Sequence, residues 1–213
     1  MGIEARPIYI AIMDPRTMIR VSRALRELDA EPKGIYREGS RIYGVALADR
    51  EGLRYLERAR VKVVGTLIRV SPSEDPMCIA LRAIVASLGV SDPSPLIVGI
   101  DLGDNIGVAL IAGRAVVFAK SVRNHYRALD LVCSSLRCVE SQRKIVRVGI
   151  PRKECPEYEK LVESLARALD EDVELELVPE ARSSKLRSYI GGLGKLSKDA
   201  RAAINIALAR LEA

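Results

Sequence analysis

The chain has 213 residues, of which 48% are hydrophobic and 29% charged, a balance typical of a globular protein with a buried core. Its formal charge of +6 permits a polyanionic partner such as nucleic acid. One histidine and four cysteines without a C-x-x-C pair leave little for histidine catalysis or a zinc site. No apolar run approaches the ~18–20 residues of a membrane span, and the chain opens without a secretion signal, so we expect a cytoplasmic protein with no membrane partner.

Residues 1–75 predict a small α+β domain. An apolar run at 7–13 indicates a strand, and Asp14-Pro15 supplies an N-cap and a first-turn proline for a helix. Two short strand-like segments near 34–37 and 41–47 flank a turn, and a helix at 50–60 and a strand at 61–70 follow. The order β-α-β-β-α-β is ferredoxin-like in outline.

Residues 76–95 predict a connecting helix and a linker. The helix spans 77–88 and ends near Gly89. Two prolines and two serines then fall within the five residues 91–95, which marks a domain boundary.

Residues 96–213 predict an α/β domain with a mixed five-stranded sheet. Three apolar runs, beginning at Leu96, Ile106 and Ala115, follow one another so closely that only hairpins can join them. Two further strands, at 145–150 and 173–178, alternate with amphipathic helices, and a last helix covers about 197–211. This β-β-β-α-β-α-β-α order fits the ribonuclease H-like fold.

Three acids stand at strand ends or at a helix start in this domain. Asp101 ends the first buried strand, where a carboxylate is costly unless it is bonded or binds metal; otherwise it merely begins a turn. Glu180 follows the fifth strand, where sites of parallel sheets gather, although a solvated loop acid is the alternative. Asp199 lies in the first turn of the last helix, which the helix dipole alone could explain. Converging carboxylates are what Mg²⁺ or Mn²⁺ needs for phosphodiester hydrolysis.

Four motifs resemble the YqgF/RuvC-like nuclease family. Residues 98–110, VGIDLGDNIGVAL, are similar to its first motif, and 148–151, VGIP, to the end of its fourth strand. Glu180 with Ser183-Ser184 resembles its Glu motif, and 191–204 resembles its glycine-rich loop and its Asp-bearing last helix. The resemblance covers residues 96–212, about half of the chain. It implies a ribonuclease H-like fold in which Asp101, Glu180 and Asp199 are catalytic residues and ligands of Mg²⁺ or Mn²⁺.

The chain departs from the family pattern in two places, and the second departure favours one of its branches. Pro179 and Ala181 replace the Asp and Arg beside the family's Glu. RuvC-type resolvases carry an acid near the end of strand four, where this chain has Gly149-Ile150-Pro151. The YqgF branch is therefore favoured over a Holliday-junction resolvase. Membership of the YqgF branch implies nuclease action on single-stranded RNA in ribosomal RNA maturation.

A group of basic residues surrounds the Glu180 and Asp199 motifs and is expected to bind nucleic acid, unless it is only a solvated positive loop. The group comprises Arg182, Lys185, Arg187, Lys195, Lys198 and Arg201.

Other functions stay open. The altered motif around Glu180 would suit a catalytically inactive nucleic-acid-binding or scaffold protein on the same fold. The segment 99–103, GIDLG, also resembles the phosphate loop of ATP-binding proteins of the actin/Hsp70-like class, but neither their second domain nor their second loop is seen. Residues 1–75 could bind RNA, form a homodimer or cover the site.

Overall fold

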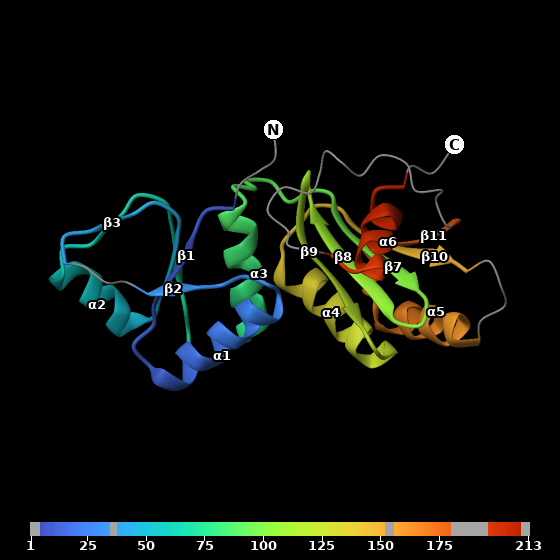
Figure 1. Cartoon of the computed structure of the whole chain (residues 1–213), viewed down its shortest axis with the longest axis horizontal. Coiled ribbons are helices and arrows are strands. Elements are labelled where there is room, and N and C mark those ends of the chain that lie inside the picture. The colour runs from blue at the N-terminus through green and yellow to red at the C-terminus, as the bar shows by residue number, and fades with distance from the viewer. Residues whose placement is uncertain (1–4, 35–37, 152–155, 180–195, 210–213) are drawn as a thin grey trace. The chain divides into compact units, whose positions relative to one another are not determined.

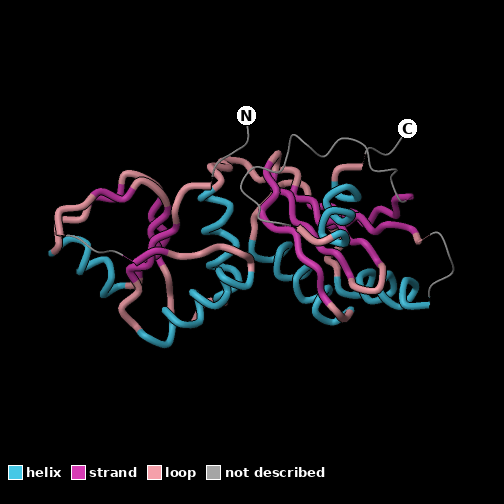
Figure 2. The backbone as a smooth tube through the Cα atoms, in the orientation of Figure 1, coloured by secondary structure: helices cyan, strands magenta, loops and turns pink. Residues whose placement is uncertain are grey.

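The computed structural model describes residues 5–34, 38–151, 156–179 and 196–209. The chain forms two compact units, Glu4–Ser91 and Asp92–Ala213, here called the N-terminal and the C-terminal unit. Figure 2 shows that each unit contains both helices and strands. Within the described ranges, no helix combines the length and the apolar character that crossing a membrane requires.

The N-terminal unit is built on a four-stranded sheet in the order β2-β1-β4-β6, and β3 and β5 form a separate two-stranded ladder. All of these ladders are parallel. The elements are β1 (Ile8–Ala11), α1 (Pro15–Glu27), β2 (Lys33–Gly34), β3 (Arg41–Ile42), β4 (Val45–Ala48), α2 (Arg50–Arg58), β5 (Lys62–Val63), β6 (Thr66–Arg69) and α3 (Pro76–Ser87).

The ferredoxin-like prediction for this unit is wrong, because such a unit contains an antiparallel hairpin where this chain forms parallel ladders. Strands β2 and β4 lie on opposite sides of β1 instead of pairing with each other. The segment 41–47 is not one strand either: β3 and β4 belong to different sheets. All four residues of β4 are buried, as a central strand of a parallel sheet requires.

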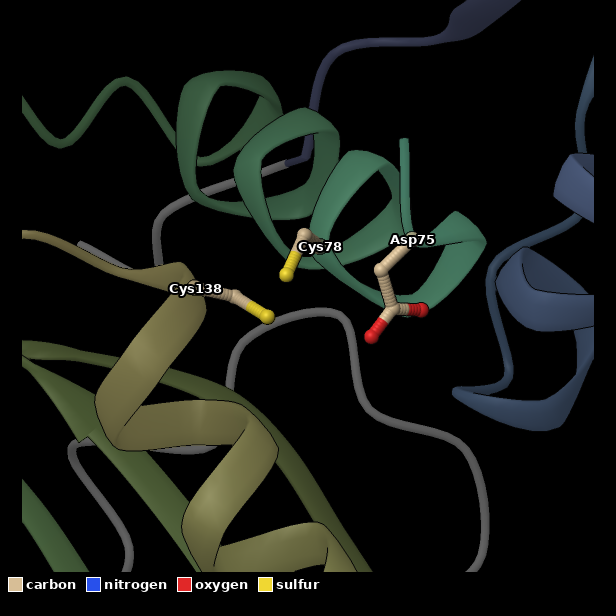
Figure 3. Close-up of side chains that lie close together, drawn as sticks. All are labelled: Asp75, Cys78 and Cys138. Atoms are coloured by element: carbon tan, nitrogen blue, oxygen red, sulfur yellow. The ribbon is translucent and has the colours of Figure 1, made fainter. Parts of the chain in front are cut away.

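Helices cover both faces of this sheet (Figure 1). Ala46 and Ala48 pack with Leu56 of α2 in one cluster, so the alternating residues Val45 and Leu47 face the opposite side. The helix expected to connect the domains, α3, packs against α1, β1 and β4 and so belongs to the N-terminal unit. Figure 3 shows Asp75 at its start; the carboxylate accepts a hydrogen bond from the Met77 N–H at 2.9 Å and caps the helix.

The C-terminal unit contains the predicted mixed five-stranded sheet, with strand order β11-β10-β7-β8-β9. The pairs β7–β8 and β8–β9 are antiparallel, as the short connections predicted, and β10 pairs in parallel with β7 and β11. The elements are β7 (Leu96–Leu102), β8 (Ile106–Ala112), β9 (Ala115–Val122), α4 (His125–Cys138), β10 (Lys144–Ile150), α5 (Pro156–Ala168), β11 (Val173–Pro179) and α6 (Lys198–Ala207).

Helix α6 crosses one face of this sheet, while α4 and α5 lie together (Figure 1), and α4 contacts β7, β8 and β9. Three alanines of α6 (Ala200, Ala203 and Ala207) and Ile204 pack on Ala109, Ile111 and Ile145 in a cluster of buried residues. Helix α4 ends at the buried Cys138, which Figure 3 labels. Small residues on both sides let α6 approach the strands closely: a Cβ atom on Gly99 would lie 2.1 Å from the Ala203 carbonyl oxygen.

Candidate functional site

Asp101 is the penultimate residue of β7 and lies on the face of the sheet that α6 covers. Successive side chains of a strand alternate between its faces, so Asp101 shares a face with Gly99, which lies beneath Ala203 and Ala207 of α6. Asp101 also pairs with Gly107 of β8, and residues paired across two strands point to the same side. Gly107 in turn lies beneath the backbone of Asp199.

Asp199 is held at this same place by the first turn of α6. The Ser197 hydroxyl caps the helix by accepting a hydrogen bond from the Ala200 N–H at 3.2 Å. On the sheet side, the Ser121 hydroxyl donates a hydrogen bond to Asp199 Oδ2 at 2.9 Å. Ser121 belongs to β9 and pairs with Gly107. The residues Asp101, Gly107 and Ser121 therefore form a row across three strands, and the start of α6 lies above it.

Glu180, the third predicted acid, lies outside the described residues, but the strand before it is in place. Strand β11 ends at Pro179, which pairs with Ile150 of β10. Strand β10 runs parallel to β7, with Val148 opposite Ile100. The carboxyl ends of β7, β10 and β11 thus meet at one edge of the sheet, and Glu180 directly follows one of them.

Two of the six predicted nucleic-acid-binding residues fall on described parts of the chain. Lys198 and Arg201 are exposed in the first turn of α6, one and two residues from Asp199 in the sequence. Arg182, Lys185, Arg187 and Lys195 lie outside the described residues.

Two residues that position α6 were not predicted from the sequence. Ser121 is one, since its role depends on the pairing of β8 with β9. Arg147 of β10 is the other: it donates to Glu176 at 2.6 Å and to the carbonyl oxygens of Ala207 and Ala209 at 2.7 Å each, at the end of α6. Its side chain is only 13% exposed. An arginine within the apolar run 145–150 was the available signal, because such a charge needs partners.

The donor atoms gathered here suit a hard divalent cation. Asp101 and Asp199 contribute carboxylates and Ser121 a hydroxyl, and all three are oxygen donors from different elements. Mg²⁺ and Mn²⁺ prefer such ligands, whereas zinc sites are built mainly from nitrogen and sulfur. Asp101 and Asp199 are therefore two described residues whose oxygens could hold such a cation.

The N-terminal unit has a hollow of about 660 Å³ at the carboxyl ends of β1, β4 and β6. The buried Asp49 lines it, but both of its carboxylate oxygens are already occupied. Oδ2 accepts from the N–H groups of Met13 and Asp14 at 2.9 Å each, and Oδ1 accepts from that of Gly52 at 2.6 Å. Asp49 thus caps α2 and ties two strand ends together, which is a structural role.

The sequence matches no protein-family model, and a search of curated proteins finds no sequence similar to it. What can be said of function therefore depends on the residues and the geometry described above.

Proposed function

We propose that the C-terminal unit is a metal-dependent nuclease of the ribonuclease H-like type, which hydrolyses phosphodiester bonds of nucleic acid. The observation that carries this proposal is the position of Asp101 and Asp199, which come from a strand end and a helix start to one face and one edge of the sheet. Carboxylates that converge from separate elements are the requirement of this chemistry.

The strand order agrees with the family resemblance. A three-stranded antiparallel meander followed by two parallel strands, with an acid-bearing helix across one face, is the arrangement that this resemblance implies. Fold alone does not make an enzyme, so the weight of the proposal lies on the acids.

Asp101 and Asp199, together with Glu180, would hold Mg²⁺ or Mn²⁺. When bound, such ions stabilise the charge on the attacking and leaving oxygens of a phosphodiester. The protein's own contribution is orientation: Ser121 fixes one oxygen of Asp199, and Arg147 holds the other end of α6. The exposed Lys198 and Arg201 supply positive charge for the phosphate backbone.

RNA is the substrate that we favour, because the resemblance is to the YqgF branch. A junction resolvase of the RuvC type is less well supported: strand β10 ends in Gly149 and Ile150, neither of which offers a carboxylate. The replaced residues around Glu180 support one other candidate, a catalytically inactive nucleic-acid-binding protein on the same fold.

Cleavage assays with matched variants test the proposal. The full chain is incubated with end-labelled RNA and DNA, single-stranded and duplex, with Mg²⁺, with Mn²⁺ or with EDTA. Cleavage should need the metal and should fall at least about 100-fold in Asp101→Asn and in Asp199→Asn, because each removes a ligand charge. Asp104→Asn, an exposed acid three residues beyond Asp101, is the control and should cleave like the parent.

Metal affinity gives a second measurement that does not depend on activity. Mn²⁺ binding by calorimetry should weaken in Asp101→Asn and stay unchanged in Asp104→Asn. Equal cleavage by Asp101→Asn and the parent would refute the nuclease assignment. Binding of nucleic acid in EDTA without cleavage of any substrate would instead support the inactive binding protein.

A further inference from the structure

A groove of about 600 Å³ lies in the N-terminal unit between helix α1 and strand β2. Three basic side chains line it, Arg23 and Arg26 from α1 and Lys33 from β2, together with the apolar Met18 and Ile19. Within the described part of the chain, strand β2 is at the edge of its sheet and pairs with β1 alone. The proposed nuclease site does not use this groove, because Asp101 and Asp199 belong to the C-terminal unit.

Helix α1 has one face buried in the core and an opposite face that is basic. Thr17, Val21, Ala24 and Leu25 are its buried residues. The opposite side exposes four arginines, which recur at spacings of three and four and so form one stripe. They are Arg16, Arg20, Arg23 and Arg26. These arginine side chains are not part of the core, so they are available to bind a ligand.

Most of this positive charge is not neutralised. Arg26 forms a salt bridge with Glu31 at 3.1 Å, and the charge of Arg16 acts on the nearby carboxylate of Asp14. Arg23 and Lys33, which line the groove, form no ion pair with any described residue. Arg20 donates to the Pro72 carbonyl oxygen, at 3.3 Å, which leaves its charge unneutralised by that contact. The helix rises ~1.5 Å per residue, so Arg16 and Arg23 are about 10 Å apart along its axis and can contact successive charges of one polyanion.

The apolar residues indicate which polyanion fits. Met18 is 38% exposed and Ile19 55% exposed, beside the unpaired cations. A nucleic-acid strand offers both matching surfaces, a phosphate backbone for the cations and base faces for the apolar side chains. None of the described residues that line this groove is aromatic, so we expect contacts to the phosphate backbone to dominate and sequence preference to be weak.

We propose that this α1–β2 groove binds the phosphate backbone of a single nucleic-acid strand. This gives the N-terminal unit a binding role of its own, which stands whether or not the C-terminal unit cleaves.

Binding by two charge-matched double variants tests the groove. A fluorescent unstructured RNA of about 20 nucleotides, longer than typical single-strand sites, is titrated with the full chain in EDTA, and a DNA of equal sequence serves as a second probe. Arg23→Gln/Lys33→Gln removes two cations from the groove. Arg58→Gln/Lys62→Gln removes one Arg and one Lys from exposed positions on α2 and β5 and is the control.

The groove variant should bind both probes about tenfold more weakly. In a plot of log K against the logarithm of the salt concentration, its slope should be shallower by about 0.7 per lost phosphate contact. The control should stay within about twofold of the parent. All four side chains are exposed, so both variants should keep the parent's melting temperature.

The proposal is overturned if the groove variant binds like the control, or if the parent binds neither probe at low salt. It is also overturned if polyglutamate displaces the fluorescent RNA from the parent as effectively as RNA does, and if this effect is lost in Arg23→Gln/Lys33→Gln. The groove would then accept an acidic protein. Because binding is measured in EDTA, loss of the nuclease proposal would not alter these outcomes.

Discussion

A Cβ atom on Gly107 would lie 2.1 Å from the carbonyl oxygen of Asp199, so β8 and the first turn of α6 are in backbone contact. Gly107 pairs with Asp101 on one side and with Ser121 on the other. This contact therefore sets the position of Asp199 relative to both residues. The candidate site is organised by the packing of a helix on a sheet.

Gly107→Ala should disturb both stability and the site. The added methyl group meets backbone, which cannot rotate away, so we expect a loss of about 1–3 kcal/mol in the free energy of unfolding, as for overpacked cores. Cleavage should fall as well, because α6 carries Asp199. Gly103→Ala is the control, since its Cβ would have its nearest neighbour at 3.5 Å, an ordinary contact. Urea unfolding of the two variants checks this, and equal losses would contradict it.

Ser121→Ala should affect metal binding more than stability. The Ser121 side chain is exposed, so loss of its hydrogen bond to Asp199 should cost at most about 1 kcal/mol. The freed carboxylate is less well oriented, however, and Mn²⁺ affinity should fall about 10-fold or more. Ser121→Thr keeps the hydroxyl and should retain most of the affinity. Calorimetry that finds Ser121→Ala as tight as the parent would rule out this positioning role.

The C-terminal sheet was predictable because its first three apolar runs are too close in sequence for any connection except a hairpin. The N-terminal sheet was not, since short apolar runs carry no information about strand direction. Residues 41–47 illustrate this: the segment reads as one strand, but Ile42 belongs to β3 and Val45 begins β4 of another sheet.

The site was predictable only in part. Asp101 and Asp199 could be found because a strand end and a helix start are visible in the sequence. Ser121 could not, because a bulge between Leu110 and Ile111 shifts the β8–β9 register by one residue. Counting back from the hairpin turn would place Lys120 opposite Gly107, whereas the bulge places Ser121 there. A one-residue shift exchanges the faces of a strand, so sequence spacing alone selects the wrong residue.

Asp49→Ala should destabilise the N-terminal unit strongly. It leaves three backbone N–H groups, those of Met13, Asp14 and Gly52, without their acceptor, and we expect a cost of about 3 kcal/mol. Asp14→Ala is the comparison: its carboxylate caps α1, accepting from the Thr17 N–H at 2.7 Å, and its loss should cost about 1 kcal/mol. Chemical denaturation of both variants measures the order, and a reversed order would disprove this reading of Asp49.

Arg147→Met should be far more costly than Arg143→Met, although each arginine pairs with a glutamate of β11. Arg147 and Glu176 are 13% and 17% exposed, and removal of one partner of a buried pair costs about 3 kcal/mol or more. The pair of Arg143 and Glu174 is 57% and 45% exposed, where ion pairs contribute at most about 1 kcal/mol. Similar unfolding midpoints for the two variants would show that Arg147 does not secure α6.

Arg143→Gln should raise the pKa of Glu174. Arg143 donates two hydrogen bonds of 2.8 Å to this carboxylate, and they, followed by its charge, hold the pKa of Glu174 below its usual value. A carboxyl group with a lowered pKa stabilises the folded chain above its unfolded pKa, and this contribution is lost as the pH falls through the folded pKa. NMR titration should therefore show Glu174 protonating at higher pH in Arg143→Gln than in the parent. Lys144→Gln removes a neighbouring charge that pairs with Asp172 at 3.9 Å and should leave this pKa nearly unchanged. If both variants raise the pKa equally, general charge and not the bidentate bond is the cause.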